Sequence, residues 1–273
     1  MVRFEGKRLL RQLPWRFIDD PYLVLSSEVM LQQTQVKRVL TYWHRWIEAF
    51  PTIDALAASS TADVLALWQG LGYNRRALAL KRAAEICSEH YGGNLPRDME
   101  SLRALPGIGP ATAAGVCVFA YQTPQVYLET NVRTVFIHHF FNDKVKVSDS
   151  EIIPLVQATC DREDPRGWYY ALLDYGSYLK SVMPNPSRRS ASHVRQTPFE
   201  GSARQKRAFL LRQVLEAPAG LVSFEGLVEA LNAFELGSGR NKVQVPEVEE
   251  MLCSLASEGF LAANSDGFWE IAK

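Results

Sequence analysis

The chain has 273 residues, of which 47% are hydrophobic and 22% are charged, and its formal net charge is zero. This length suffices for a substantial core in one large or two ordinary domains. The neutral balance argues against a histone-like protein that binds by bulk charge, but it leaves room for a local basic face. No apolar run reaches the roughly 18 residues of a membrane span, and no signal-peptide pattern is evident, so we expect a cytoplasmic protein without a membrane partner.

The first half of the chain is predicted to be helical. A short lead-in, Leu13-Pro-Trp-Arg16, precedes a helical pattern over about 22–46 that is interrupted near Gln32–Gln35. Further helices begin near Thr52 and Thr61, and an apolar stripe with helical spacing follows from Arg75 to about His90.

A glycine-rich stretch near the middle of the chain carries the strongest single motif. Gly107 and Gly109 separate two helical patterns, where a tight turn requires a positive φ or a backbone without Cβ. An Ala-rich helix is expected after Pro110. The amides at this turn would point outward together and bind one phosphate. A short apolar link, Val126–Leu128, then delivers Glu129 to the start of another helix.

The last third of the chain changes in character. After helices to about Leu179, the segment from Lys180 to Arg207 has seven cations and one acid, Glu200. We interpret residues 183–202 as an extended basic linker that faces phosphates, with an ordinary solvated loop as the alternative. Three helices and two short alternating strands follow, an order typical of a winged helix.

Together these residues resemble the helix-hairpin-helix DNA glycosylases (HhH-GPD), closest to the MutY-type adenine glycosylases. The resemblance covers about Leu13–Leu179 and depends on several motifs in order. They are Leu13-Pro-Trp-Arg16, Ser27–Val36, Leu67-Trp-Gln-Gly-Leu-Gly-Tyr73, Leu105-Pro-Gly-Ile-Gly109, Asn131-Val132 and Leu173-Asp-Tyr-Gly176. It implies a mainly α fold, a two-lobed helical core followed by a small α+β winged-helix-like domain. The predicted boundaries are 1–182 for the core (hairpin 105–115), 183–202 for the linker and 203–273 for the last domain.

The resemblance also implies an activity, excision of a flipped base by hydrolysis of its N-glycosidic bond. Such a reaction passes through an oxocarbenium-like state and uses two carboxyl groups. Glu28 matches the position of the acid that protonates the departing base, and Glu129 matches the carboxylate that stabilises the sugar cation. The alternative for Glu28 is an ordinary surface charge on a helix.

Three departures from the family pattern qualify this expectation. Glu129 stands where the family has Asp, which lengthens the side chain by one methylene. Ala111 occupies the hairpin position of the lysine that forms a Schiff base in bifunctional relatives, which favours a monofunctional hydrolase. The four-cysteine iron–sulfur motif of the relatives would begin near Lys180, but no cysteine follows until Cys253. We therefore expect no iron–sulfur cluster and no other metal, and leave open a monovalent cation at the hairpin.

The remaining matches imply contacts to double-stranded DNA by a protein expected to be a monomer at the nucleoid. The expected DNA-binding residues are Gln32, Gln33 and Gln35, which would enter the duplex when a base leaves it, together with Tyr73, Arg75, Gly107, Gly109, Asn131, Arg188, Arg189 and Arg195. The expected base pocket consists of Leu13, Trp15 and Arg16.

The substrate is less defined than the reaction. A second tyrosine usual after Gly-Leu-Gly-Tyr is here Asn74, and a winged helix stands where the family usually has a domain for oxidised guanine. The sequence thus leaves two substrates, adenine in a mispair and a mispaired or damaged pyrimidine. It also leaves a second class of function, a catalytically weak protein that binds lesions or DNA structures.

Overall fold

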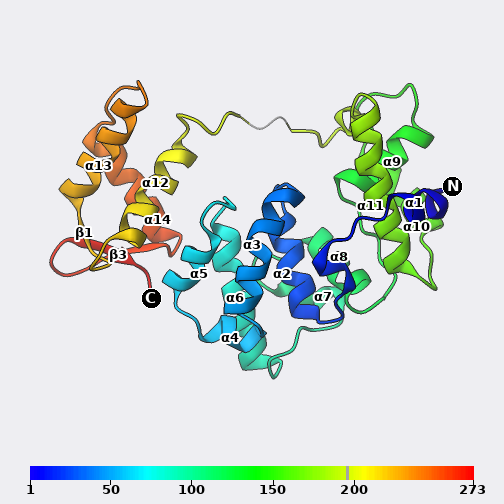
Figure 1. The fold of residues 1–273 in the computed structure, drawn as a ribbon, viewed down its shortest axis with the longest axis horizontal. Coiled ribbons are helices and arrows are strands. Elements are labelled where there is room, and N and C mark those ends of the chain that lie inside the picture. The colour runs from blue at the N-terminus through cyan, green and yellow to red at the C-terminus, as the bar shows by residue number, and fades with distance from the viewer. Residues whose placement is uncertain (195–196) are drawn as a thin grey trace. The chain divides into compact units, whose positions relative to one another are not determined.

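The structure is a computed structural model that describes residues 1–194 and 197–273; Arg195, one of the predicted DNA contacts, lies outside these residues. Two compact units are present (Figure 1). The larger unit contains the described residues 1–57 and 82–194. The smaller unit contains residues 58–81 and 197–273.

The larger unit is helical throughout. One group of helices centres on the contact of α2 with α8 and includes α3 and α7; a second group consists of α1, α9, α10 and α11 (Figure 1). The bounds are α1 (Val2–Leu9), η1 (Pro14–Phe17), α2 (Pro21–Leu31), α3 (Val36–Ala49), α4 (Ile53–Ala58), α7 (Met99–Ala104), α8 (Pro110–Phe119), α9 (Thr130–Phe140), α10 (Asp149–Thr159), α11 (Pro165–Val182) and η2 (Pro186–Arg189). The predicted mainly α fold is confirmed.

Local sequence explains where these helices begin. Asp20 accepts hydrogen bonds from the first amides of α2, with Pro21 at the first helical position. Asp164 and Pro165 start α11 in the same way, and Ser148 starts α10 with a capping box. These side chains satisfy amides that a helix cannot satisfy by itself.

The helix–hairpin–helix motif consists of α7, a short turn and α8. Gly107 has φ +73°, as predicted for the turn. Gly109 differs from the prediction. It is the N-cap of α8 with φ −81°, and a Cβ there would meet no atom of the described residues within 4 Å. The folded chain alone therefore does not require glycine at position 109.

The core of the larger unit joins the two helix groups. Val118 and Phe119 from α8, Val132 from α9 and Leu172 from α11 are all buried in one apolar cluster. Tyr127, on the link that precedes α9, belongs to the same cluster. This packing fixes α9 against α8 and so determines where the N-terminus of α9 points.

The start of the basic segment is packed rather than extended, which corrects the prediction for 183–202. Pro186 and Ser187 are buried in η2, and Ser190 forms a parallel bridge with Val147. The Arg189 guanidinium donates to the carbonyls of Ile137 (3.2 Å), Asn142 (2.6 Å) and Phe141 at the end of α9. Carbonyls at a helix C-terminus lack partners within the helix, so Arg189 acts as their cap.

The smaller unit consists of helices and one sheet. Its elements are α5 (Thr61–Trp68), the start of α6 (Arg75–His90), α12 (Ala203–Glu216), β1 (Val222–Ser223), α13 (Phe224–Gly237), α14 (Val245–Ser257), β2 (Leu261–Ala263) and β3 (Phe268–Ile271). The sheet has the antiparallel order β1-β3-β2, with Val222 opposite Trp269 and Ala262 opposite Glu270. The two short strands predicted near the end of the sequence are β2 and β3, and they form a β-hairpin that turns at Gly267, which has φ +80°.

The N-terminal helix α1, the strand β1 and the two short 3₁₀ helices η1 and η2 were not predicted from the sequence. No helix in residues 1–194 or 197–273 is both long and apolar enough to cross a membrane.

The packing of Arg189 predicts different effects for two neighbouring arginines. Arg189→Ala should lower the free energy of unfolding by about 1–3 kcal/mol, because it removes the guanidinium hydrogen bonds to the carbonyls at the end of α9. Arg188, which is exposed, is the matched control, and Arg188→Ala should change stability by less than about 0.5 kcal/mol. Chemical denaturation of both variants measures the difference; equal stabilities would contradict the capping role.

Candidate active site

Glu28 lies on α2 at the contact with α8. Its Oε2 accepts a hydrogen bond from the Tyr127 hydroxyl at 3.1 Å. A Cβ on Gly115 of α8 would lie 2.5 Å from the same oxygen, so only glycine leaves room for the carboxyl there. The side chain is enclosed by protein but keeps a partly exposed surface, which a substrate could reach.

The environment of Glu28 favours its protonated form near neutral pH. Burial raises the pKa of this carboxyl to about 7. The Tyr127 hydrogen bond and the Arg16 charge lower it, whereas the Glu129 charge raises it. The rise from 4.5 to about 7 corresponds to about 3 kcal/mol in favour of the protonated acid. Glu28 can therefore serve as a proton donor at neutral pH.

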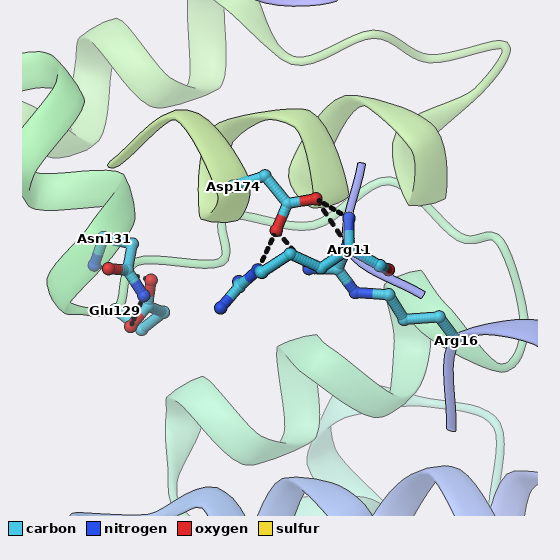
Figure 2. Close-up of polar contacts among 5 residues, drawn as sticks. All are labelled: Arg11, Arg16, Glu129, Asn131 and Asp174. Atoms are coloured by element: carbon cyan, nitrogen blue, oxygen red, sulfur yellow. Dashed lines mark hydrogen bonds and ion pairs between the residues drawn. The ribbon is translucent and has the colours of Figure 1, made fainter. Parts of the chain in front are cut away.

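Glu129 is the N-cap of α9. Its Oε1 accepts from the backbone amides of Asn131 (2.6 Å) and Val132 (3.2 Å), and its Oε2 accepts from the Asn131 side chain at 3.4 Å (Figure 2). Burial raises the pKa of this carboxyl, while the amide of Asn131 acts in the opposite direction and stabilises the anion. The free amides of a helix start favour negative charge there.

Asn131 keeps one polar atom available. Its Oδ1 is buried, and within the described part of the chain it has no hydrogen-bond partner. A buried acceptor without a donor is costly, so this oxygen suits a water molecule or a substrate group beside Glu129.

A buried ion-pair group is centred on Asp174 (Figure 2). Asp174 on α11 accepts from both terminal nitrogens of Arg16, at 2.6 and 2.8 Å, and from the backbone amide of Arg11 at 3.0 Å. The Arg11 side chain also pairs with Asp174. The Arg16 guanidinium covers the ring of Tyr170 at 4.5 Å. Arg16 is therefore fixed in place by Asp174 rather than free to move.

The predicted base-pocket residues Leu13, Trp15 and Arg16 are all buried. Trp15 packs edge-on against Trp43 with ring centroids 5.7 Å apart. Arg16 contributes to the charge that Glu28 experiences. Arg16 is thus close enough to Glu28 to influence its pKa, whereas Trp15 is anchored in the core.

The three glutamines that are predicted to enter the duplex occupy different environments. Gln32 is the C-cap of α2, and its amide donates to the Thr112 hydroxyl on α8 at 2.9 Å. Gln33 and Gln35 are exposed. Gln33 has φ +52°, a left-handed conformation that costs a residue other than glycine about 1 kcal/mol or more. Such strain is typical of functional positions.

The other predicted DNA contacts are divided between the units. Gly107, Gly109, Asn131, Arg188 and Arg189 lie in the larger unit, and Arg189 uses its guanidinium within the protein. Tyr73 and Arg75 lie in the smaller unit, where Tyr73 has φ +49° and Arg75 pairs with Glu258 at 2.6 Å.

The cysteines do not fit the donor set of an iron–sulfur cluster, which requires four thiolates at one point. Cys87 and Cys117 are buried, Cys160 is partly buried and Cys253 is exposed. In the described ranges no three His, Cys, Asp or Glu side chains form a group that could hold a metal ion. The absence of a cluster stays a prediction.

Sequence reasoning missed three residues of this site. Tyr127 appeared only as part of an apolar link, and Asp174 and Gly115 appeared only as parts of motifs or helices. A tyrosine two positions before a predicted catalytic carboxylate was the available signal for Tyr127. The Asp174 pairing connects positions 158 and 163 residues apart, and no local pattern reveals it.

Comparison with known proteins identifies similar sequences. A model of the HhH-GPD superfamily of base excision DNA repair proteins matches residues 26–153. The adenine DNA glycosylase of Mycolicibacterium smegmatis is 47% identical over 126 residues, 46% of this chain and 43% of that protein. The adenine DNA glycosylase of Mus musculus is 39% identical over 207 residues, 67% of this chain and 37% of that protein. The chain thus spans less than half the length of these relatives.

Solved structures show the same fold. A thermostable thymine-DNA glycosylase aligns with a TM-score of 0.60 at 20% identity, covering 68% of this chain and 87% of that one. An endonuclease III bound to DNA aligns with a TM-score of 0.57 at 20% identity, covering 67% and 86%. Residues 26–153, which contain both Glu28 and Glu129, thus match the HhH-GPD superfamily of base excision DNA repair proteins.

Proposed function

We propose that this protein is a DNA glycosylase of base excision repair, which flips one nucleotide out of duplex DNA and hydrolyses its N-glycosidic bond. The observation that carries the proposal is the pair of partly exposed carboxyls, Glu28 and Glu129, within the HhH-GPD domain. Their environments differ, since one accepts from a tyrosine hydroxyl and the other from helix amides. Because their environments differ, two otherwise identical carboxyl groups can take different roles, Glu28 as the protonated acid and Glu129 as the anion.

In this mechanism Glu28 donates its proton to a ring nitrogen of the departing base. Loss of the base leaves positive charge on the sugar, which the Glu129 carboxylate stabilises. A water beside Glu129 and the Asn131 Oδ1 then attacks the sugar carbon and gives up a proton to the Glu129 carboxylate, which completes hydrolysis. No lysine occupies the hairpin position, where Ala111 stands, so the reaction ends at an abasic site.

Double-stranded DNA is the proposed partner, bound by a monomer. The hairpin amides at Gly107 and Gly109 would hold a phosphate, and the open space at Gly109 suits a close backbone approach. The exposed, strained Gln33 would enter the helix as the base leaves. Adenine in a mispair is the first candidate substrate because the named relatives are adenine DNA glycosylases; a mispaired or damaged pyrimidine is the second.

A second candidate is a lesion-binding protein with weak catalysis, favoured by Glu129 in the place of an aspartate. Incubation with duplexes that carry a panel of mispairs and lesions, followed by alkaline cleavage at abasic sites, separates the two. Strand breaks at one base support the glycosylase. Tight binding without breaks on any duplex would support the second candidate.

Glu28→Gln should reduce excision by about 10²- to 10⁴-fold, because an amide cannot donate the proton. Affinity for duplex DNA should stay within a few-fold of wild type.

In the wild type, excision should slow as pH rises above about 7, because Glu28, the acid with the raised pKa, loses its proton there. Single-turnover rates across pH measure both effects. Glu48→Gln, at an exposed position on α3, is the control and should behave as wild type; full activity of Glu28→Gln would remove Glu28 from the mechanism.

Glu129→Asp tests whether the site is built around the longer side chain. Asp is a good N-cap, so the fold should remain stable. The carboxylate would retract by about one bond length, and we expect excision to slow by at least about 10-fold. Glu129→Gln, which keeps the length but loses the charge, should be inactive. Excision rates and thermal unfolding of both variants check this; a faster Asp variant would show that Glu129 is a degenerate remnant.

A further inference from the structure

Lys180 lies next to the start of α9, on a face of α11 that packs closely against it. A Cβ added to Gly176 of α11 would lie 2.2 Å from the carbonyl oxygen of Asn131, so the two backbones touch at this point. Residues four apart share one face of a helix. Lys180 therefore lies on the same face of α11, one turn beyond this contact, and its charge interacts with that of Glu129.

The charged and titratable groups around Glu129 come from every neighbouring element. Electrostatic interactions connect Glu129 with Glu28 on α2, Tyr127 on the preceding link, Arg133 on α9 and Lys180 on α11. The charge of Arg11, on the segment before η1, acts against that of Lys180 and lowers its pKa.

The arginines in this group already have carboxylate partners. Arg133 makes a bidentate pair with Asp149 at 2.7 Å for both bonds, and Arg11 and Arg16 pair with Asp174. In the described part of the chain Lys180 has no direct ion pair of its own. Its charge is thus the one that remains for Glu129.

We infer that Lys180 is an electrostatic positioning residue that keeps Glu129 ionised and leaves Glu28 as the proton donor. The inference rests on the proposed glycosylase function and deepens it. Two neighbouring carboxyls repel, and a cation beside one of them decides which loses its proton first. The resemblance places the start of the iron–sulfur motif near Lys180, so a cation stands where the relatives begin a metal-binding segment.

The directions of the individual pKa values agree with this division of roles. Burial raises the pKa of Glu129; the Asn131 amide opposes that rise most strongly, and Lys180 is the next opposing group. Burial lowers the pKa of Lys180, and the Glu129 charge raises it again. For Glu28, the charge on Glu129 raises the pKa. Loss of the Lys180 charge would therefore bring the two carboxyls closer in acidity.

The test compares Lys180→Met, which removes the charge, with Lys180→Arg, which keeps it. Lys7→Met, at an exposed position on α1, is the control for loss of one cation from the larger unit. Carboxyl carbon NMR of the DNA-free protein, assigned with Glu129→Gln, measures the titration of Glu129. The midpoint should rise by about one pH unit in Lys180→Met and should stay near wild type in the other two variants.

Single-turnover excision provides the second readout. The acidic limb of the pH–rate profile should shift upward by the same amount in Lys180→Met, and Lys180→Arg should restore it. An unchanged Glu129 titration in Lys180→Met would overturn the inference. If the titration shifts but no duplex is ever cleaved, the proposed function fails while the role of Lys180 in ionising Glu129 stands.

Discussion

Two carboxyl groups enclosed in one helical unit repel each other, and the rest of the site follows from how this repulsion is resolved. The larger unit sets Glu129 at a helix N-terminus, where two backbone amides donate to one oxygen. In the described part of the chain, Glu28 accepts a hydrogen bond from a phenolic hydroxyl and from no helix amide. Burial raises the pKa of both carboxyls, and amides at the start of α9 oppose that rise only at Glu129. The fold therefore favours the anion at Glu129 and the protonated acid at Glu28.

The architecture of the larger unit holds these two environments apart. Core packing of α8 against α9 and α11 determines where the first turn of α9 points. Asp174 holds Arg16 over the Tyr170 ring, so a strong cation is kept close enough to influence Glu28 but remains bonded to its own partner. The polar groups of the site are thereby anchored by buried neighbours, which suits a reaction that is sensitive to small displacements.

The sequence predicted those features that depend on local patterns. Helix positions followed from periodicity and capping residues, and Glu28 and Glu129 followed from motifs in the expected order. Features that depend on distant contacts were not predictable. Helix α1 is polar on most of its surface and packs through Gly6, where a Cβ would lie 2.2 Å from that of Ala171. The packed position of Arg189 also differed from the prediction, because its partners are carbonyls that carry no sequence signal.

The smaller unit is assembled from two segments that lie far apart in the sequence, which affects how it folds during synthesis. Residues 58–81 belong with residues 197–273, which the ribosome makes much later. Val64, Leu65 and Trp68 of α5 are buried in the finished protein, and α5 contacts α12. These apolar side chains emerge well before that partner segment exists. The nascent chain lacks this partner until that segment has been made, a stage at which exposed apolar surface favours aggregation.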